Sequence, residues 1–83
     1  MWIRSQDGGS LVDCHELHIS STRDTKFRIY EQKEVEPDHW IELGVYTAEK
    51  DCKEVLTHMH SSIRHNSNLY IMPSQKDVES WRS

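Results

Sequence analysis

Residues 44–64, which read GVYTAEKDCKEVLTHMHSSIR, decide the fold of this 83-residue chain because they carry its strongest helical pattern. An extended run ends before Thr47, and the apolar residues that follow recur at intervals of three and four, which places them on one stripe of an α-helix. Thr47 is a suitable N-cap for this helix. The predicted helix runs from Ala48 to Arg64, and Asn66 is expected to end it in the left-handed conformation. Its apolar stripe consists of Cys52, Val55, Leu56, Met59 and Ile63.

The other apolar runs are short and alternate with polar residues, which is typical of strands. Asp7-Gly8-Gly9-Ser10 favours a hairpin turn, because glycine accepts positive φ angles. The run after it keeps no single phase, so we expect a bulge or bend near His15-Glu16. Loops are expected at Ser20–Thr25 and at the acidic segment Lys33–Asp38, where Pro37 excludes a ladder. The predicted strands are Met1–Gln6, Ser10–Ile19, Lys26–Gln32, Trp40–Tyr46 and Leu69–Met72.

These elements predict an α+β fold with two layers. An antiparallel-dominated sheet of four or five strands is expected to be covered on one face by a single helix, in the order β-β-β-β-α-β. Short connections favour antiparallel pairing, because a parallel pair needs a long crossover. We expect one domain over residues 1–73, followed by a polar C-terminal tail, residues 74–83, that either docks through Trp81 or stays free.

Composition limits the classes of function. The net charge of −4 disfavours non-specific binding to nucleic acid or to an anionic membrane. A signal peptide needs an apolar run of about 7–15 residues and a membrane helix about 20, whereas the longest apolar runs here have three residues. We therefore expect a cytoplasmic protein whose two cysteines are reduced thiols.

Three segments resemble small proteins of Gram-positive bacteria and of their phages and mobile elements. Residues 1–7, MWIRSQD, with Leu11-Val12 shortly after, are similar to the start of these proteins. Residues 43–56, LGVYTAEKDCKEVL, resemble their strand-to-helix junction, although those proteins usually carry a small residue at the position of Cys52 and more glutamate in the first helical turn. Tyr70–Pro73 resembles their ending. The resemblance covers roughly half of the chain. It implies a phage or mobile-element setting, and brings no established activity or catalytic residue with it.

The sequence contains no convincing catalytic or metal-binding pattern. The segment Cys14-His15-Glu16-Leu17-His18 differs from the zinc motif His-Glu-x-x-His in spacing, and a strand places its two histidines on opposite faces. Cys52 lies on the apolar stripe, where a buried thiol is unreactive, and nothing in the sequence orients Cys14 as a nucleophile. Gly8-Gly9 lacks the Lys and Ser/Thr of a phosphate-binding loop. We therefore expect no enzyme activity, no bound metal and no cofactor.

Strand alternation divides the strand residues between two faces of the predicted sheet. The residues expected to face the helix are Ile3, Phe27, Ile29, Ile41, Leu43, Val45, Leu69 and Ile71. Because a single helix covers only one side of a sheet, the opposite face is expected to be exposed. It collects tyrosine, tryptophan and arginine, which are enriched in interface cores. The candidate binding residues on it are Trp2, Arg4, Arg28, Tyr30, Trp40, Tyr46 and Tyr70, with Glu42 and Met72 beside them.

The leading hypothesis is a small non-enzymatic interaction module that uses this aromatic face to bind a host protein, to form a homodimer, or both. The alternative is a small-ligand binder, for example of a nucleotide, with a site at a subunit junction where Arg4 and Arg28 supply polar groups. Nucleic acid is not an expected partner, because a stacking platform for single strands needs a positively charged groove. The same aromatics would equally suit cross-strand pairing without a partner, or a face covered by the tail.

Overall fold

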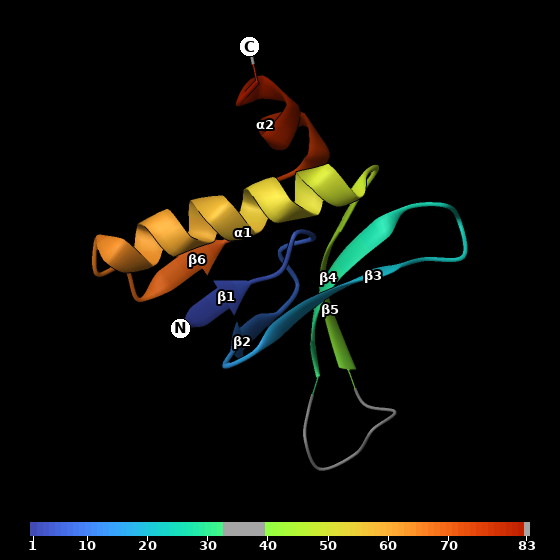
Figure 1. The fold of residues 1–83 in the computed structure, drawn as a ribbon. Coiled ribbons are helices and arrows are strands. Elements are labelled where there is room, and N and C mark those ends of the chain that lie inside the picture. The colour runs from blue at the N-terminus through green and yellow to red at the C-terminus, as the bar shows by residue number, and fades with distance from the viewer. Residues whose placement is uncertain (33–39, 83) are drawn as a thin grey trace.

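One long helix and two small sheets organise the chain (Figure 1). The computed structural model describes residues 1–32 and 40–82, so the predicted acidic loop Lys33–Asp38 lies outside the described residues. The strands and helices are β1 (Trp2–Arg4), β2 (Leu11–Asp13), β3 (Leu17–Ser21), β4 (Phe27–Gln32), β5 (Trp40–Tyr46), α1 (Glu49–Arg64), β6 (Leu69–Ile71) and α2 (Gln75–Ser80). Within the described residues, the strands form a first sheet of order β2-β1-β6 and a second sheet of order β3-β4-β5. The α+β class is therefore confirmed.

The predicted helix is confirmed as α1, which lies between α2 and the two sheets (Figure 1). Cys52, Val55 and Met59 are buried in the shared core, as their spacing predicts. Leu56 is half-buried against that core. Ile63, which the pattern places on the same stripe, is exposed in the last turn. The apolar stripe therefore packs into the core only along the first three turns of α1.

The two ends of α1 are capped in different ways. The N-cap is Ala48 rather than the predicted Thr47, and the Asp51 carboxylate accepts the Ala48 N–H bond at 3.2 Å. An acidic residue of the first turn thus supplies the capping acceptor that alanine lacks. At the other end Asn66 has φ of 61°, so its predicted left-handed conformation is confirmed.

The structure has two sheets where the sequence predicts one. The predicted strand Ser10–Ile19 divides between them, because β2 pairs antiparallel with β1 while β3 pairs antiparallel with β4. The chain leaves the first sheet after Cys14, whose N–H donates to Met1 O at 2.9 Å. His15 N–H then donates to the buried Glu31 carboxylate at 2.9 Å, outside either ladder. The bend expected near His15-Glu16 is therefore present, and it separates two sheets.

The last strand has the opposite phase to the predicted one. β6 follows α1 and pairs in parallel with β1, with Tyr70 opposite Ile3. Directly paired residues share a face of the sheet, and Ile3 faces the core. Tyr70 is therefore buried, while Leu69 and Ile71, which were expected to face the helix, are exposed. The long return through α1 permits this parallel pair, while the other pairs among the described strands are antiparallel, as predicted.

A β-bulge reverses the phase of β5 partway along the strand. The β4–β5 register skips Leu43 between two consecutive pairs, so β5 carries one extra residue. Leu43 and Gly44 are both buried, and alternation resumes one residue later. Tyr46 therefore points into the core, and Val45 is half-buried on the other face. The predicted phase of this strand is right up to Leu43 and wrong after it.

Gly44 makes room for the inward tyrosine. A β-carbon at this position would lie 3.0 Å from both the ring and the hydroxyl of Tyr46 and 3.2 Å from Cε of Met72. The Tyr46 hydroxyl donates to Pro73 O at 2.7 Å, which satisfies it inside the core. A larger residue at position 44 would displace the ring from this bond.

Gln6 joins the two sheets just after β1. Its side-chain oxygen accepts the Val45 N–H bond at 2.9 Å, and its amide nitrogen donates to Val45 O and to Pro73 O, both at 3.2 Å. Its backbone N–H donates to Leu43 O at 2.7 Å. Gln6 therefore forms hydrogen bonds with backbone groups at the edge of β5, as a neighbouring strand would.

The C-terminal tail forms α2 and packs against α1 rather than against an outer sheet face (Figure 1). Ser74 caps α2 by accepting the Asp77 N–H bond at 3.1 Å. Val78 is buried in the core, and the Trp81 ring lies over His58 with 4.4 Å between centroids. The tail thus docks through both Val78 and Trp81. Neither helix in the described part of the chain has the length and apolar character needed to cross a membrane.

Candidate binding surfaces

The structure distributes the seven predicted binding residues among three places. Five lie on outer faces, but on different sheets: Trp2 and Arg4 on the first, and Arg28, Tyr30 and Trp40 on the second. The other two were wrongly placed on an exposed face, because Tyr46 is only 1% exposed and Tyr70 only 5%. Met72, expected beside them, is also buried. The bulge in β5 and the parallel register of β6 account for these three errors.

The two buried tyrosines use their hydroxyls inside the protein. The Tyr70 hydroxyl lies 2.7 Å from Nδ1 of His58, which in turn stacks on Trp81. Burial raises the pKa of Tyr70 to about 12. Burial likewise raises the pKa of Tyr46 well above its ordinary value. Both groups are therefore neutral structural donors or acceptors near neutral pH, and neither is available to a partner.

The outer face of the second sheet carries a set of stacked side chains, which we call the arginine–aromatic patch. His18, Tyr30 and Trp40 stack in sequence across β3, β4 and β5, with centroid distances of 5.6 Å for His18–Tyr30 and 5.8 Å for Tyr30–Trp40. The Arg28 guanidinium lies 4.4 Å from the Trp40 ring centroid, within range of a cation–π contact. A hollow of about 160 Å³ lies among them. Its lining residues are Ser20, Arg28, Tyr30, Gln32 and Trp40.

Arg28 has an unused hydrogen-bond donor in this patch. Its Nε is buried, and among the described residues no acceptor lies within hydrogen-bonding distance of it. Glu42 Oε2 is 3.7 Å away, which makes an ion pair but not a hydrogen bond. Buried donors are nearly always paired in folded proteins, so this atom is suited to receive an acceptor from another molecule.

The outer face of the first sheet is of a different kind, and we call it the apolar face. Across the three strands, Trp2 lies between Asp13 and Leu69, and Arg4 lies between Leu11 and Ile71. The sequence pattern missed three of its members, because it assigned Leu69 and Ile71 to the core and gave Leu11 no role. Alternation is uninformative for β6, where apolar residues occupy both faces of the strand.

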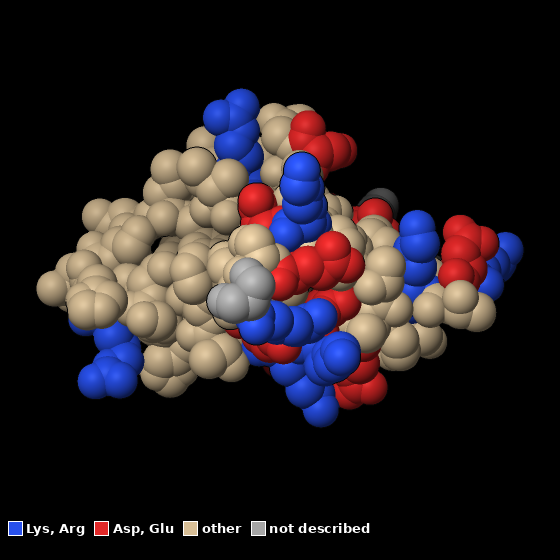
Figure 2. Space-filling view, turned by 90° about the horizontal axis from the view of Figure 1, so that it is seen from above, with Lys and Arg blue, Asp and Glu red and all other residues tan. Residues whose placement is uncertain are grey.

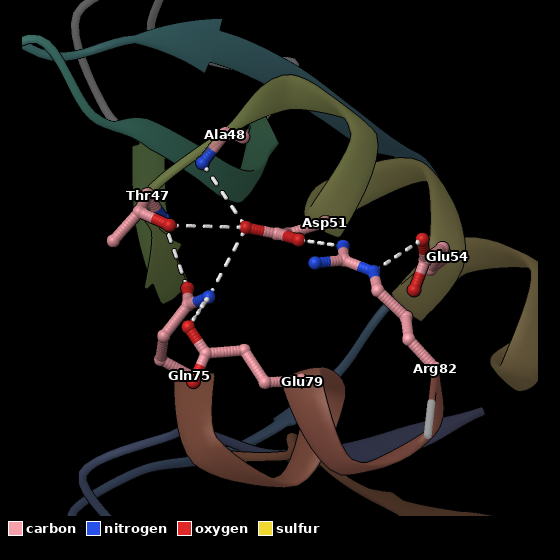
Figure 3. A network of polar contacts seen from close by, with 7 residues as sticks. All are labelled: Thr47, Ala48, Asp51, Glu54, Gln75, Glu79 and Arg82. Carbon is pink, nitrogen blue, oxygen red and sulfur yellow. Dashed lines mark hydrogen bonds and ion pairs between the residues drawn. The ribbon is translucent and has the colours of Figure 1, made fainter.

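A polar network joins the start of α1 to α2 (Figure 3). Its centre is the buried carboxylate of Asp51. Oδ2 accepts from Thr47 Oγ1 at 3.1 Å, from Gln75 Nε2 at 3.1 Å and from the Ala48 N–H group, while Oδ1 pairs with Arg82. Glu54 pairs with the same guanidinium at 3.0 Å. Both oxygens of the carboxylate are occupied by the protein itself, so this network holds α2 in place and offers no free group to a substrate.

In the part of the chain that the structure describes, the nucleophilic and metal-binding residue types are not assembled into a site. Cys52 is buried in the core, and burial raises the pKa of its thiol to about 11, so the reactive thiolate is scarce near neutral pH. Cys14 is also buried, and neither cysteine is part of a disulfide. Within residues 1–32 and 40–82, no group of three or more His, Cys, Asp or Glu side chains is arranged to hold a metal ion.

Charges of both signs are mixed on the face that carries the helices. Figure 2 shows blue and red side chains interspersed at the centre and right of this view, and a largely uncharged region at the left. The left end is where the C-terminal half of α1 lies in Figure 1. No continuous basic groove is visible on this face, although a single-strand binder follows the nucleic-acid backbone with one.

No family model matches the chain, and comparisons with curated proteins and with solved structures found no match either. The two outer sheet faces are the candidate binding surfaces of the chain.

Proposed function

We propose that the chain is a small non-enzymatic interaction module that binds a protein partner through the arginine–aromatic patch. The observation that carries the proposal is the buried Nε of Arg28, which makes no hydrogen bond with the described residues and lies beside the exposed ring of Trp40. Tryptophan, tyrosine and arginine are the residues most enriched among interface hot spots. The patch is also prearranged, because Tyr30 and Arg28 already hold Trp40 by edge-to-face and cation–π contacts.

The patch indicates the chemistry of its partner. The group that approaches Arg28 is an acceptor, either a backbone carbonyl or a carboxylate, and a charge-assisted bond of this kind is stronger than a neutral one. An apolar or aromatic side chain of the partner would cover Trp40 next to it. A hydrophobic contact beside a single buried polar contact is the usual composition of an interface core.

The small-ligand alternative has weaker support. The hollow of about 160 Å³ at the patch is smaller than the roughly 300–1,000 Å³ of ordinary ligand sites. Arg4 and Arg28, which a shared site would use together, lie on the outer faces of different sheets. A ligand site would therefore require a second chain to bring two arginines together.

The proposed setting is the cytoplasm of a Gram-positive bacterium, with the chain encoded by a phage or mobile element and its partner encoded by the host. The resemblance of residues 1–7 and 43–56 supports this setting. The absence of a disulfide between Cys14 and Cys52 is in keeping with a reducing compartment.

The test is affinity capture from a Gram-positive lysate, followed by titration of the purified partner. Trp40→Asp and Arg28→Lys should each weaken binding at least about tenfold, since lysine keeps the charge but loses the planar stacked donor. Arg23→Ala, in the exposed β3–β4 loop, is the matched control and should leave the affinity unchanged. Circular dichroism confirms that each variant folds. Unchanged affinity in both patch variants would refute the proposal.

A further inference from the structure

The apolar face exposes four large hydrophobic side chains to water. Trp2 is 47% exposed, Leu11 59%, Leu69 48% and Ile71 64%, and none of the described elements covers them. These four side chains together expose about 400 Å², which lies within the range for the largest apolar patch of a typical monomer, a patch that is often functional. This surface is separate from the arginine–aromatic patch and does not depend on its function.

The apolar face combines a projecting ring with a hollow. Trp2 lies in one row of the sheet, and a hollow of about 290 Å³ lies beside the next row. Arg4 lines that hollow, and its Nε donates to Gly8 O at 3.3 Å, which fixes the guanidinium there. The residues lining the hollow are Arg4, Gly8, Gly9, Ser10, Leu11, Leu69 and Ile71.

We propose that the apolar face binds a second copy of this chain, face to face, about a twofold axis that runs across the strands. Such an axis exchanges the two rows of the face and keeps each strand opposite its own copy. Trp2 of each chain then enters the hollow of the other and stacks on its Arg4. Leu69 of each chain lies against Ile71 of the other. The face is self-complementary in this arrangement, as a twofold interface requires.

Charge distinguishes this arrangement from the other twofold axis of the same face. An axis parallel to the strands would place Arg4 against Arg4 and Trp2 against Trp2, so two like charges would meet in a desolvated interface. The axis across the strands separates the two guanidinium groups and gives each an indole ring, which is a favourable cation–π contact. The two Trp2 rings are then the central anchors, each in a pocket.

The size of the face predicts a modest affinity. The exposed apolar area and its polar rim approach the low end of stable interfaces, which bury about 600 Å² or more on each partner. We expect a dissociation constant in the micromolar range, the weak end of what interfaces of standard size show. The dimer would also present two arginine–aromatic patches, so a partner with two copies of the recognised group would bind with higher avidity.

The first test is the molar mass of the purified chain by light scattering and sedimentation, up to a concentration of about 200 µM. Wild type should be dimeric at the upper end. Leu69→Asp and Ile71→Ser should each weaken dimerisation at least about tenfold while keeping the native circular dichroism, because both side chains are exposed in the single chain. Trp40→Asp, on the other sheet, should dimerise normally. A wild type that stays monomeric, or a dimer that Trp40→Asp disrupts and Leu69→Asp does not, would overturn the proposal.

The second test examines the symmetry axis by cross-linking. Treatment of an equimolar mixture of Leu69→Cys and Ile71→Cys chains with a short bifunctional thiol cross-linker, which spans the separation of two packed sheets, should give a covalent dimer much faster than either variant alone. The native cysteines do not compete, because both are buried. The axis parallel to the strands would instead bring Leu11 opposite Ile71, so faster cross-linking of Leu11→Cys with Ile71→Cys would overturn the arrangement.

Discussion

On the second sheet, the Trp40 ring meets Tyr30 edge-on and lies near the Arg28 guanidinium, whereas on the first sheet Leu69 and Ile71 remain largely in water. Both outer faces arise from the same strand alternation. They differ because, among the described residues, the outer face of the second sheet carries one large exposed apolar side chain, Trp40, which contacts Tyr30 and Arg28, while that of the first sheet carries four: Trp2, Leu11, Leu69 and Ile71. Exposed apolar surface therefore concentrates on the first sheet, although the aromatic patch is on the second.

Side chains on the inner faces of the two sheets should contribute equally to stability. Truncating one of them should cause the largest loss of stability. Ile3 of the first sheet and Ile29 of the second are both buried in one core. Ile3→Ala and Ile29→Ala should each lower the free energy of unfolding by about 2–5 kcal/mol, a large fraction of the total stability of a small domain. Urea denaturation followed by circular dichroism measures both. A large loss for Ile29→Ala with almost none for Ile3→Ala would show that the first sheet is not part of the core.

The hydrogen bonds by which Gln6 joins the two sheets should produce the next largest loss of stability. Gln6→Ala removes three side-chain hydrogen bonds that link the end of β1 to β5 and Pro73. The expected loss is about 2–3 kcal/mol, at about 1 kcal/mol for each bond. Gln6→Glu is the matched variant: it keeps the acceptor for Val45 N–H, loses both donors and sets a carboxylate against two carbonyl oxygens. Wild-type stability in Gln6→Glu would contradict the role assigned to the donors.

Buried phenols on both sheets predict a loss of stability at high pH. The folded-state pKa of Tyr70, about 12, lies above the ordinary value of 10, which the unfolded chain is expected to show. The stabilisation from the neutral phenol is therefore complete below pH 10 and is lost as the pH rises to about 12. Tyr70 alone contributes roughly 2 kcal/mol to this loss. The free energy of unfolding of Tyr70→Phe, measured from pH 8 upward, should decline less steeply than that of wild type, and equal slopes would contradict the assignment.

Substitutions on the outer faces should have the smallest effect on the stability of the monomer. At a concentration low enough to exclude dimers, Trp40→Ala should lower the free energy of unfolding by about 1 kcal/mol, because it removes a cation–π and an edge-to-face contact. Trp2→Ala should change it by less than about 0.5 kcal/mol, as for an ordinary surface substitution. Thermal unfolding of both variants measures the difference. Equal losses would mean that the contacts of Trp40 with Tyr30 and Arg28 add no stability.

Part of the candidate site was predictable from the sequence. Arg28, Tyr30 and Trp40 were placed together correctly, because they lie before the bulge in β5 and on a strand with regular alternation. The partners His18 and Gln32 were missed, although His18 is set directly opposite Tyr30 by the antiparallel register. Only the pairing of β3 with β4 brings them to one surface, and no local pattern specifies that register.

The sequence by itself determined the helix, its left-handed end at Asn66, the turn at Gly8 and the positions of most strands, because each depends on residues within a few positions of one another. Tertiary structure decided the division into two sheets, the parallel pairing of β6 with β1 and the bulge at Leu43. A shift of one residue in a strand exchanges its two faces, and both choices bury apolar side chains in β6. The free energy of pairing between distant segments determines which face of each strand is buried. For this reason Tyr46 and Tyr70 are in the core while Leu69 and Ile71 face outward.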